Sequence, residues 1–362
     1  MGLDALAKFK APTVEIAPDK NPDEFMSAIP VAIVGVGQAG GRIADAAWEL
    51  GFRRVVAINT SREDLGALRH VPSGNRFVYG SGGSGKDPSR GRKQFDDAAG
   101  AIYDFLASRL GEHTELVLVT AGAGGGTGSG ALLDGSILRL ARQYIETTQA
   151  TRKGVGLILT LPEPAEGAGT IENAKRVLQA VSGDGPEPPY SPLIVVDNAR
   201  VTRMWGSVSI TQKWPTANTF IMSAIQAFLM MAAEQAIAYT FDPVDLWKLW
   251  QSGALVLGFF DVQGTVDATS LADAVRKGVG SGLMATGARI QDATQAAILF
   301  AGSTQALDGV RTTDFEYASH ALQDMVHGTA TIHRGVYEAP IDGIRVFTAI
   351  GGMPVPAWPS AE

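Results

Sequence analysis

The chain has 362 residues, of which 45% are hydrophobic and 19% are charged, as in a globular protein of about two domains. Its 30 basic and 37 acidic residues give a net charge of −7, so no general positive field attracts a nucleic acid, and we expect no nucleic-acid partner. The absence of cysteine excludes disulfides, thiolate metal sites and thiol nucleophiles, which leaves oxygen, nitrogen and backbone groups for the chemistry.

Residues 1–29 predict an N-terminal extension rather than a targeting signal. The apolar residues Leu3, Leu6 and Phe9 are separated by charged residues, so the segment lacks the apolar core of a signal peptide. A short amphipathic membrane anchor at these three residues is the alternative to a mobile polar tail. We therefore expect a cytoplasmic protein.

From residue 30 to residue 213 the sequence predicts a parallel sheet covered by helices. Short β-branched runs alternate with longer helical patterns, which is typical of a doubly wound α/β domain. The segment 182–192 is rich in turn-forming residues and predicts an exposed loop. The predicted strands are 31–34, 55–58, 76–79, 116–120, 155–161 and 193–196.

A long apolar stretch follows, and we place a central helix at 214–240. Its most apolar part, 220–233, is shorter than the ~20 residues of a membrane span and predicts a buried core helix. Residues 241–352 predict a second, smaller α/β domain, and 353–362 predict a short disordered tail. In the second domain the strand-like runs are 255–262, 296–301, 329–337 and 344–350, and the helical patterns are 269–282 and 313–326.

A glycine-rich loop at 35–41 follows the first predicted strand and precedes a helical pattern. In this arrangement backbone N–H groups and a helix N-terminus bind phosphate. The loop also matches the dinucleotide fingerprint of NAD-dependent oxidoreductases. However, the second strand ends in Asn59, Thr60 and Ser61, without the acidic residue that holds the ribose in those enzymes. An NAD-dependent oxidoreductase is therefore a remote alternative.

The loop at 121–130 is more specific, because six glycines in ten residues stand between a buried strand and an apolar helix. Glycine lets the backbone approach an anion closely, and Thr127 and Ser129 add hydroxyl donors. A third glycine-rich stretch, 80–88, either wraps a terminal phosphate or is a flexible linker. It differs from a Walker A loop, because Lys86 is followed by Asp87.

The run Gly124-Gly-Gly-Thr-Gly-Ser-Gly130 resembles the signature loop of the tubulin and FtsZ superfamily of GTPases. The resemblance extends in order over residues 30–352. It implies a tubulin/FtsZ-like α/β fold, with a Rossmann-like parallel-sheet GTP-binding domain at 30–213, the long central helix, and a C-terminal GTPase-activating domain at 241–352. It also implies GTP and GDP as ligands, with Mg²⁺ bound mainly by phosphate oxygens and waters, and we name no protein ligand for the metal.

The resemblance also implies individual nucleotide contacts. Trp214 matches the aromatic residue that stacks on the base, although an ordinary core or interface aromatic is the alternative. Asn198 and Asn218 match the side chains that reach the guanine edge, and Glu166 matches the ribose contact. The residues matched to the phosphate loops are Gly37, Gln38, Ala39, Gly40, Gly41, Asn59, Gly83, Gly85, Ala121, Gly122, Gly124, Gly125, Gly126, Thr127 and Gly128.

Residues 240–246 resemble the loop that enters the nucleotide pocket of the next subunit, which implies that Asp242 and Asp245 are catalytic. Two carboxylates at positions i and i+3 of a helix start lie on one face and are able to orient or partly deprotonate an attacking water. For Asp242, which precedes Pro243, a helix N-cap is the structural alternative.

Three departures from the family pattern bear on the hydrolysis rate more than on nucleotide binding. Thr240 stands where this loop usually has Asn, and Ser61 stands where division-type FtsZ has Asp. The fifth loop reads Ala168-Gly-Thr170 where the family usually has an arginine. Because the first loop looks closer to tubulin and to the archaeal CetZ branch than to bacterial FtsZ, we expect a divergent FtsZ-like or CetZ-like protein.

The leading hypothesis is a GTPase that assembles with itself head to tail into filaments, in cell division or cell shape, and hydrolyses GTP at the subunit interface. The alternative is a GTP-dependent filament or scaffold protein with little or no GTPase activity. The tails identify no membrane or protein adaptor. The histidines, at positions 70, 113, 320, 327 and 333, show no i, i+4 spacing, and we assign none of them to a metal.

Overall fold

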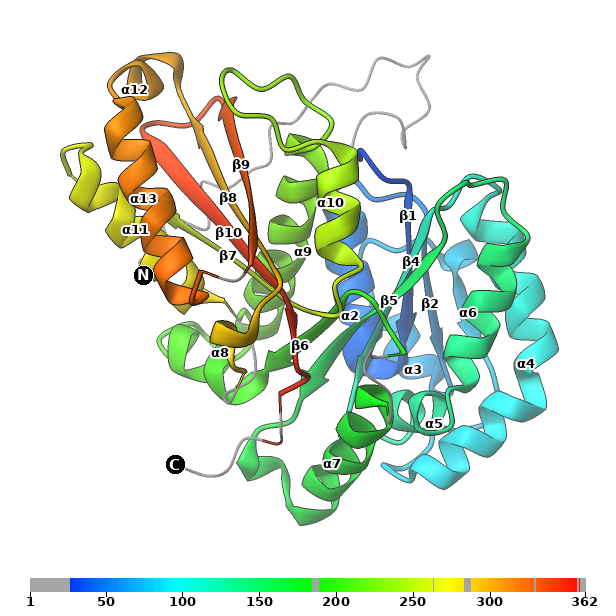
Figure 1. Ribbon diagram of the computed structural model, residues 1–362. Helices are drawn as coiled ribbons and strands as arrows, with labels where there is room; N and C mark the ends of the chain where they lie inside the picture. The colour runs from blue at the N-terminus through cyan, green and yellow to red at the C-terminus, as the bar shows by residue number, and fades with distance from the viewer. Residues whose placement is uncertain are drawn as a thin grey trace.

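The computed structural model in Figure 1 describes residues 27–183, 189–262, 264–282, 288–328, 330–356 and 358. Most of the predicted N-terminal extension lies outside these residues. So do residues 184–188 of the predicted loop and most of the predicted C-terminal tail.

All the strands predicted from the sequence are present, and they join in one ten-stranded sheet of order β3-β2-β1-β4-β5-β6-β7-β10-β8-β9. Strands β1 to β6 are parallel, as predicted. Strand β10 runs antiparallel to both of its neighbours, β7 and β8, whereas β9 runs parallel to β8. The strands are β1 (Val31–Val36), β2 (Val55–Asn59), β3 (Arg76–Val78), β4 (Leu116–Gly122), β5 (Gly154–Leu161), β6 (Leu193–Asp197), β7 (Ala254–Asp261), β8 (Gln295–Gly302), β9 (Thr331–Glu338) and β10 (Ile344–Met353).

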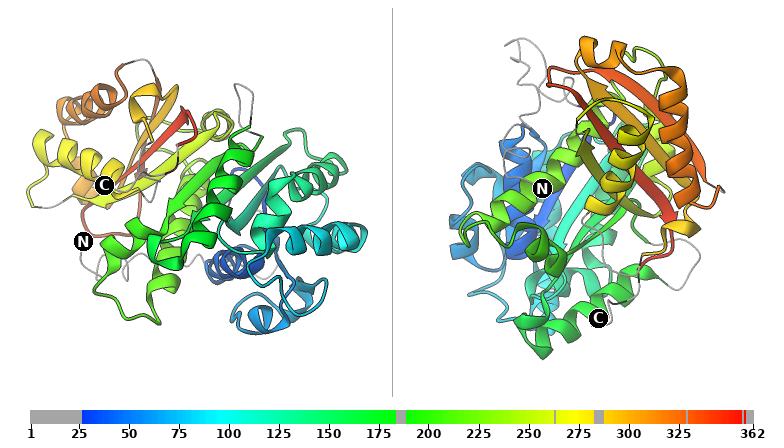
Figure 2. Two further views of the ribbon diagram at one scale, coloured as in Figure 1. Left: turned by 90° about the horizontal axis from the view of Figure 1, so that it is seen from below. Right: turned by 90° about the vertical axis from the view of Figure 1, so that its left-hand side faces the viewer.

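Helices cover both faces of the sheet (Figures 1 and 2). On the β1–β6 part, α2 and α9 pack on one face, and α4 to α7 pack on the other. On the β7–β10 part, α11 and α13 cover the face turned away from α9. The helices are α2 (Gly37–Glu49), α3 (Arg62–Gly66), α4 (Pro88–Leu110), α5 (Thr127–Leu133), α6 (Ser136–Glu146), α7 (Ala168–Ser182), α8 (Asn198–Trp205), α9 (Lys213–Met231), α10 (Pro243–Trp250), α11 (Ala268–Ser281), α12 (Thr304–Asp308) and α13 (Thr312–Met325).

Alternation along the central strands fills two cores at once. In β4, Leu116 and Leu118 pack in the core that contains α2 and α9, whereas Val117 and Val119 pack in the core that contains α4 and α6. Successive side chains of a strand point to opposite faces, so a strand buried on both faces consists of apolar residues almost throughout. This is why the parallel strands were recognisable as short continuous apolar runs.

Helix α9 lies between the β1–β6 part and the β7–β10 part of the sheet. Phe220 stacks on Phe259 of β7 with 4.7 Å between ring centroids, and Phe228 meets Phe347 of β10 edge-on at 6.3 Å. The prediction of a buried core helix is therefore confirmed. None of the helices within the described residues combines the length and the apolar character needed to cross a membrane.

The C-terminal end of α9 differs from the prediction, because the helix stops at Met231 rather than at residue 240. Beyond the helix, the chain runs along the edge strand β9. The Ile237 N–H donates to the Val336 carbonyl at 2.8 Å, and the Val336 N–H donates to the Tyr239 carbonyl at 3.1 Å. Tyr239 also stacks on Phe315 of α13 with 4.7 Å between centroids. These contacts replace helical hydrogen bonds, so the apolar sequence continues but the helix does not.

Besides α9, two contacts link the β1–β6 part of the sheet and its surroundings to the β7–β10 part. Strands β6 and β7 share one registered pair, Leu193 with Ala254, and Arg200 of α8 donates to the carbonyl of Gly280 in α11. Residues of the predicted tail contribute as well, since Val355 and Trp358 are half-buried against the core that contains α4 and α6. Burying these two apolar side chains stabilises the position of this part of the predicted tail.

Candidate functional site

Two adjoining cavities lie at the carboxyl ends of the parallel strands β1, β2, β4 and β5. The first has a volume of about 320 Å³ and the second of about 310 Å³. Open α/β sheets bind ligands at this edge, and cavities of this size hold small molecules. The residues that line both cavities are Gln38, Ala39, Thr160, Glu166 and Asn198.

Glycines bring the β1 and β4 loops together at the first cavity. Gly37, the first residue of α2, has a φ of 73°, and a Cβ added to it would lie 3.2 Å from the backbone N of Gly128. A Cβ on Gly40 would lie only 1.9 Å from the carbonyl oxygen of Thr120, so α2 packs directly on β4. The N-terminus of α2 thus opens into the first cavity, where its free N–H groups and dipole favour an anion.

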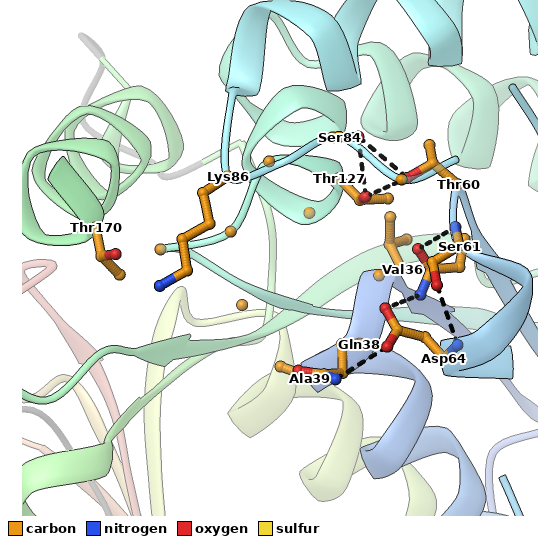
Figure 3. Close-up of a pocket in the computed structure, with 18 of the residues that line it drawn as sticks. Val36, Gln38, Ala39, Thr60, Ser61, Asp64, Ser84, Lys86, Thr127 and Thr170 are labelled. Atoms are coloured by element: carbon orange, nitrogen blue, oxygen red, sulfur yellow. Dashed lines mark hydrogen bonds between the residues drawn. The ribbon is translucent and has the colours of Figure 1, made fainter. Parts of the chain in front are cut away.

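Three hydroxyls from three different loops meet beside this cavity (Figure 3). The Thr60 Oγ1 lies 2.7 Å from the Thr127 Oγ1, and the Ser84 Oγ lies 3.1 Å from each of them. Ser84 in turn donates to the Gln94 side chain at 3.0 Å. All three hydroxyl-bearing side chains are buried. The segment 80–88 is therefore tied to the other loops in this structure, and the flexible-linker interpretation is wrong for Ser84.

Asp64 was not singled out from the sequence, yet it lies on the wall of the first cavity. Its carboxylate accepts from the Gln38 amide at 3.0 Å and from the Asn59 amide at 3.2 Å (Figure 3). It thereby holds the β1 and β2 loops together. The available signal was an acid in the first turn of the helix that Ser61 caps, three residues after the position where division-type FtsZ has Asp.

Lys86 was also missed, and it is the one cationic residue among the described residues that line the first cavity. Its side chain extends across the cavity toward Thr170 (Figure 3). Thr170 lies in the first turn of α7, directly after the fifth loop, where the family resemblance implies an arginine. The backbone of Lys86 has a φ of 61°, and its carbonyl accepts from the Asn173 side chain of α7 at 3.0 Å. The fixed backbone directs this cation into the cavity from a different loop.

The second cavity lies at the start of α9 and is lined by Trp214 and the buried Asn218. The Glu163 carboxylate of the fifth loop accepts from the Lys213 ammonium at 2.5 Å, and this ammonium lies 4.4 Å from the Trp214 ring centroid. The Glu166 side chain is held against the same loop, because its carboxylate accepts a hydrogen bond from the Glu163 N–H at 2.8 Å. The fifth loop and the start of α9 therefore form one wall.

Most of the residues matched to the nucleotide line one of these cavities. Gly40, Gly41 and Ala121 line neither of them, because Gly40 and Ala121 pack where α2 meets β4 and a Cβ on Gly41 would face Leu68. Trp214 and Asn218 line the second cavity alone. The matched residues on the first cavity are Gly37, Gln38, Ala39, Asn59, Gly83, Gly85, Gly122, Gly124, Gly125, Gly126, Thr127, Gly128, Glu166 and Asn198.

The acidic pair lies at the opposite end of the sheet from the cavities. The carbonyl of Pro243 accepts from Arg152 at 3.1 Å, just before β5 begins, whereas the cavities follow the ends of the strands. Figure 1 accordingly places α10 near the top of the view and α5 and α7 near the bottom. The Asp242 Oδ1 accepts from the N–H groups of Val244 and Asp245 at 2.7 and 2.9 Å, so Asp242 is the predicted N-cap of α10.

Asp245 has a partner that sequence reasoning did not assign. The His333 Nδ1 of β9 lies 3.2 Å from the Asp245 Oδ1, and the His333 Nε2 lies 2.9 Å from the Gln295 Oε1 of β8. The His333 side chain is only 7% exposed, and that of Asp245 is 25% exposed. Burial lowers the pKa of His333, and the negative charge of Asp245 partly opposes this shift. No local spacing in the sequence links these two residues.

The family model described as "Tubulin/FtsZ family, GTPase domain" matches residues 30–200, which include all the residues that line the first cavity. The tubulin-like protein CetZ of Pyrococcus abyssi is 30% identical, over 55% of this chain and 52% of that protein. The cell division protein FtsZ 1 of Pyrococcus woesei is 27% identical, over 60% of this chain and 57% of that protein. The matches thus span little more than half the length of these two relatives.

Solved structures match a larger share of the chain. TubZ of Bacillus thuringiensis serovar israelensis, in a GTPγS-form protofilament, is 21% identical with a TM-score of 0.78, over 93% of this chain and 91% of that chain. CetZ2 of Haloferax volcanii, in a GTPγS-bound protofilament, is 23% identical with a TM-score of 0.71, over 91% of this chain and 94% of that chain. The tubulin/FtsZ-like fold predicted from the sequence is confirmed.

Proposed function

Because the chain belongs to the tubulin/FtsZ superfamily, we propose that it binds GTP in the two adjoining cavities and assembles head to tail into filaments. GTP is then hydrolysed where Asp242 and Asp245 of one subunit meet the nucleotide of the next. The observation that carries this proposal is the placement of the cavities and the acidic pair at opposite ends of one sheet. The carboxylates are too remote to act on a nucleotide in their own subunit.

The two cavities divide the nucleotide between them in this proposal. The phosphates occupy the first cavity, where the N-terminus of α2 and the glycine loops present backbone N–H groups. Lys86 pairs with the terminal phosphate, in place of the arginine missing from the fifth loop. The base occupies the second cavity, with Trp214 on its face and the buried Asn218 at its edge.

A divalent cation fits this donor set only as a partner of the phosphates. Among the described residues, no group of three or more His, Asp or Glu side chains is arranged to hold a metal. The acids on the first cavity are Asp64, whose carboxylate is engaged by two amides, and Glu166. Mg²⁺ would neutralise phosphate charge, held mainly by phosphate oxygens and waters.

Hydrolysis itself requires little covalent chemistry from the protein. Water attacks the terminal phosphorus, the bond to the bridging oxygen breaks, GDP leaves, and the carboxylates orient the water and accept its proton. Positioning provides most of the rate, so completing the site from a neighbour makes hydrolysis depend on assembly. The contact is heterologous, with different surfaces at its two sides, and therefore propagates as a filament. The TubZ and CetZ2 structures with this fold are themselves protofilaments.

A second candidate is a GTP-dependent filament or scaffold protein with little or no hydrolysis. The observation that favours it is that both carboxylates already have partners within the subunit, since Asp242 caps α10 and Asp245 contacts His333. Thr240 and the altered fifth loop point the same way. This candidate predicts assembly with stoichiometric bound GTP and no release of phosphate.

The test is phosphate release from GTP as a function of protein concentration, for the full chain, for Asp245→Asn and for Asp104→Asn. Asp104 is an exposed acid on α4 and serves as the matched control. We expect a rate per subunit that rises from near zero above a critical concentration, in the wild type and the control but not in Asp245→Asn. A rate per subunit that does not depend on concentration contradicts a shared site. Binding of NAD in preference to GTP would favour the oxidoreductase instead.

A further inference from the structure

We propose that His333 is a positioning residue that holds the Asp245 carboxylate for hydrolysis in the neighbouring subunit and weakens hydrolysis when it is protonated. This inference rests on the function proposed above. His333 is not part of the segment 240–246 that the family resemblance singled out. His333 belongs to β9, and its imidazole is the partner that contacts the Asp245 carboxylate.

The first step of the argument is geometric. Asp245 is in the first turn of α10, and the backbone of that turn is fixed by the Asp242 cap. Its side chain would still rotate freely without a partner. The His333 Nδ1, 3.2 Å from the Oδ1, removes that freedom and leaves the second carboxylate oxygen as the acceptor for water. A buried imidazole on a strand is a rigid support, since strand and ring each have few alternative positions.

The immediate surroundings of the imidazole are also defined on each side. Phe241 lies edge-on to the ring with 5.9 Å between centroids, and Gln295 contacts the far nitrogen. The charged groups that act on the ring are Asp245, Asp242 and Lys248, all on α10. The contact from β8 is the neutral amide of Gln295. The pKa of His333 is therefore lowered mainly by burial, raised mainly by Asp245, and lowered further by Lys248.

Gln295 allows both protonation states of the imidazole to be hydrogen-bonded. With its oxygen toward the Nε2, the amide accepts from a protonated ring whose Nδ1–H donates to Asp245. A half-turn of the amide presents an N–H instead, which a neutral ring accepts while its Nδ1–H still donates to Asp245. Protonation thus changes the charge beside Asp245 without breaking its hydrogen bond. The carboxylate next to an imidazolium is a weaker base.

The consequence is a hydrolysis rate that falls as the pH falls through the pKa of His333, while assembly itself continues. At neutral pH the ring is neutral, because burial lowers its pKa below the ordinary value. The Asp245 carboxylate then lies beside an uncharged ring and keeps its orientation. Below that pKa the positive charge of the imidazolium offsets the negative charge of the Asp245 carboxylate, which is the charge that helps to deprotonate the attacking water.

The experiment compares full-length wild type with His333→Ala, His333→Asn and His70→Asn. His70 is the matched control, because its Nδ1 lies 3.3 Å from the Asp45 carboxylate on the surface of the β1–β6 part of the molecule. Phosphate release per assembled subunit is measured from about pH 5.5 to about pH 8, a range in which histidine is the side chain that ordinarily titrates. The critical concentration is measured in parallel with GTPγS.

We expect His333→Ala to lower the turnover of assembled subunits about tenfold to a hundredfold at neutral pH, with the critical concentration unchanged. His333→Asn retains a donor for Asp245 and should recover part of this loss, but without the acid limb of the wild-type pH profile. His70→Asn should behave as the wild type. Equal turnover in His333→Ala and wild type, or an acid limb that persists in His333→Asn, overturns the inference.

A second measurement does not depend on turnover. The pKa of His333 is followed by NMR of ¹⁵N-labelled imidazole signals in GDP-bound protein below the assembly concentration, with His333→Asn used for assignment. We expect Asp245→Asn to lower this pKa, because the carboxylate that favours the imidazolium is removed. An unchanged pKa contradicts the contact. If wild-type protein releases no phosphate at any concentration, the proposed hydrolysis fails as a whole. If wild-type protein hydrolyses GTP and the His333 variants hydrolyse it at the same rate, only the inference about His333 is rejected.

Discussion

At the scale of single residues, Lys86 is the side chain whose contribution to nucleotide affinity should depend most on whether the nucleotide carries a terminal phosphate. We expect Lys86→Ala to lower GTP affinity about tenfold to a hundredfold and GDP affinity much less, since a hydrogen bond to a charged group contributes about 1.5 to 3 kcal/mol. Competition against a fluorescent nucleotide measures both affinities. Lys93→Ala is the matched control, because the Lys93 ammonium pairs with Asp97 at 2.7 Å on the exposed side of α4. An equal loss of GTP and GDP affinity would place Lys86 away from the terminal phosphate.

His333 should also make the stability of the folded protein depend on pH. Burial lowers its pKa in the folded state, so between that pKa and the ordinary value of about 6.5 the unfolded chain binds more protons. The contribution is therefore fully present above about pH 6.5 and is lost as the pH falls, by at most about 1.4 kcal/mol per pH unit. Urea unfolding of wild type and His333→Asn measures it. An identical pH dependence in the two proteins contradicts this prediction.

The residues found from the sequence and those that were missed differ in a physical way. The glycine loops were predictable, because a run such as 121–130 has to follow a buried strand and precede a helix within one short segment. Asp64, Lys86 and His333 have partners from distant segments, namely Gln38 for Asp64, the opposite cavity wall for Lys86 and Asp245 for His333. No local pattern contains such a contact.

At the scale of elements, the fit of α2 on β4 depends on one of two adjacent glycines. We expect Gly40→Ala to destabilise the protein by about 1 to 3 kcal/mol and to weaken nucleotide binding, because the added Cβ lies 1.9 Å from the Thr120 oxygen and forces α2 away from β4. Gly41→Ala is the matched control. Its Cβ would be 3.8 Å from the nearest atoms, of Leu68, and alanine stabilises a helix by about 1 kcal/mol relative to glycine.

Urea unfolding and a nucleotide titration on the two variants test this difference. Destabilisation by Gly41→Ala as large as that by Gly40→Ala would show that α2 tolerates no side chain anywhere along this turn. The contact of α2 with β4 would then not be what fixes the first cavity.

Element boundaries were predictable where packing and backbone pattern agree, and not where they compete. The strands and the helices at 269–282 and 313–326 agree with the structure to within a few residues. The end of α9 does not, because apolar residues continue past Met231 while the backbone turns to pair with Val336. Hydrophobic periodicity predicts which side chains are buried, but it does not predict which partners the backbone N–H and carbonyl groups bind.

At the scale of the whole molecule, the proposed shared site predicts that two inactive variants restore each other. Lys86→Ala removes a residue of the nucleotide side, and Asp245→Asn removes one of the acidic side. In an equimolar mixed filament, about one quarter of the head-to-tail contacts combine an intact cavity with an intact acidic pair. At a GTP concentration that saturates wild type but leaves Lys86→Ala largely unbound, phosphate release from the mixture should therefore reach about a quarter of the wild-type rate, while each variant alone stays near zero.

The control is a mixture of Asp245→Asn with the Lys86→Ala, Asp245→Asn double variant, which forms no complete contact. Recovery in this control, or none in the mixture of single variants despite normal co-sedimentation, contradicts catalysis between subunits. The fold that makes this design possible was predictable from the order of its motifs. The direct distances across a subunit contact were not, since one chain contains only half of each site.

The segment that follows α9 has a further effect, on the solubility of this protein at the high local concentration that the proposed filament would create. An uncovered strand at the end of a sheet recruits other strands and leads to aggregation. Here Ile237 and Tyr239 occupy hydrogen-bonding groups of β9, the last strand at one end of the sheet. The other end is β3, a strand of three residues, Arg76–Val78, which offers little to an incoming chain. Association through β-strand addition is thereby suppressed at both margins, and growth of the proposed filament is left to the surfaces that carry the two cavities and the acidic pair.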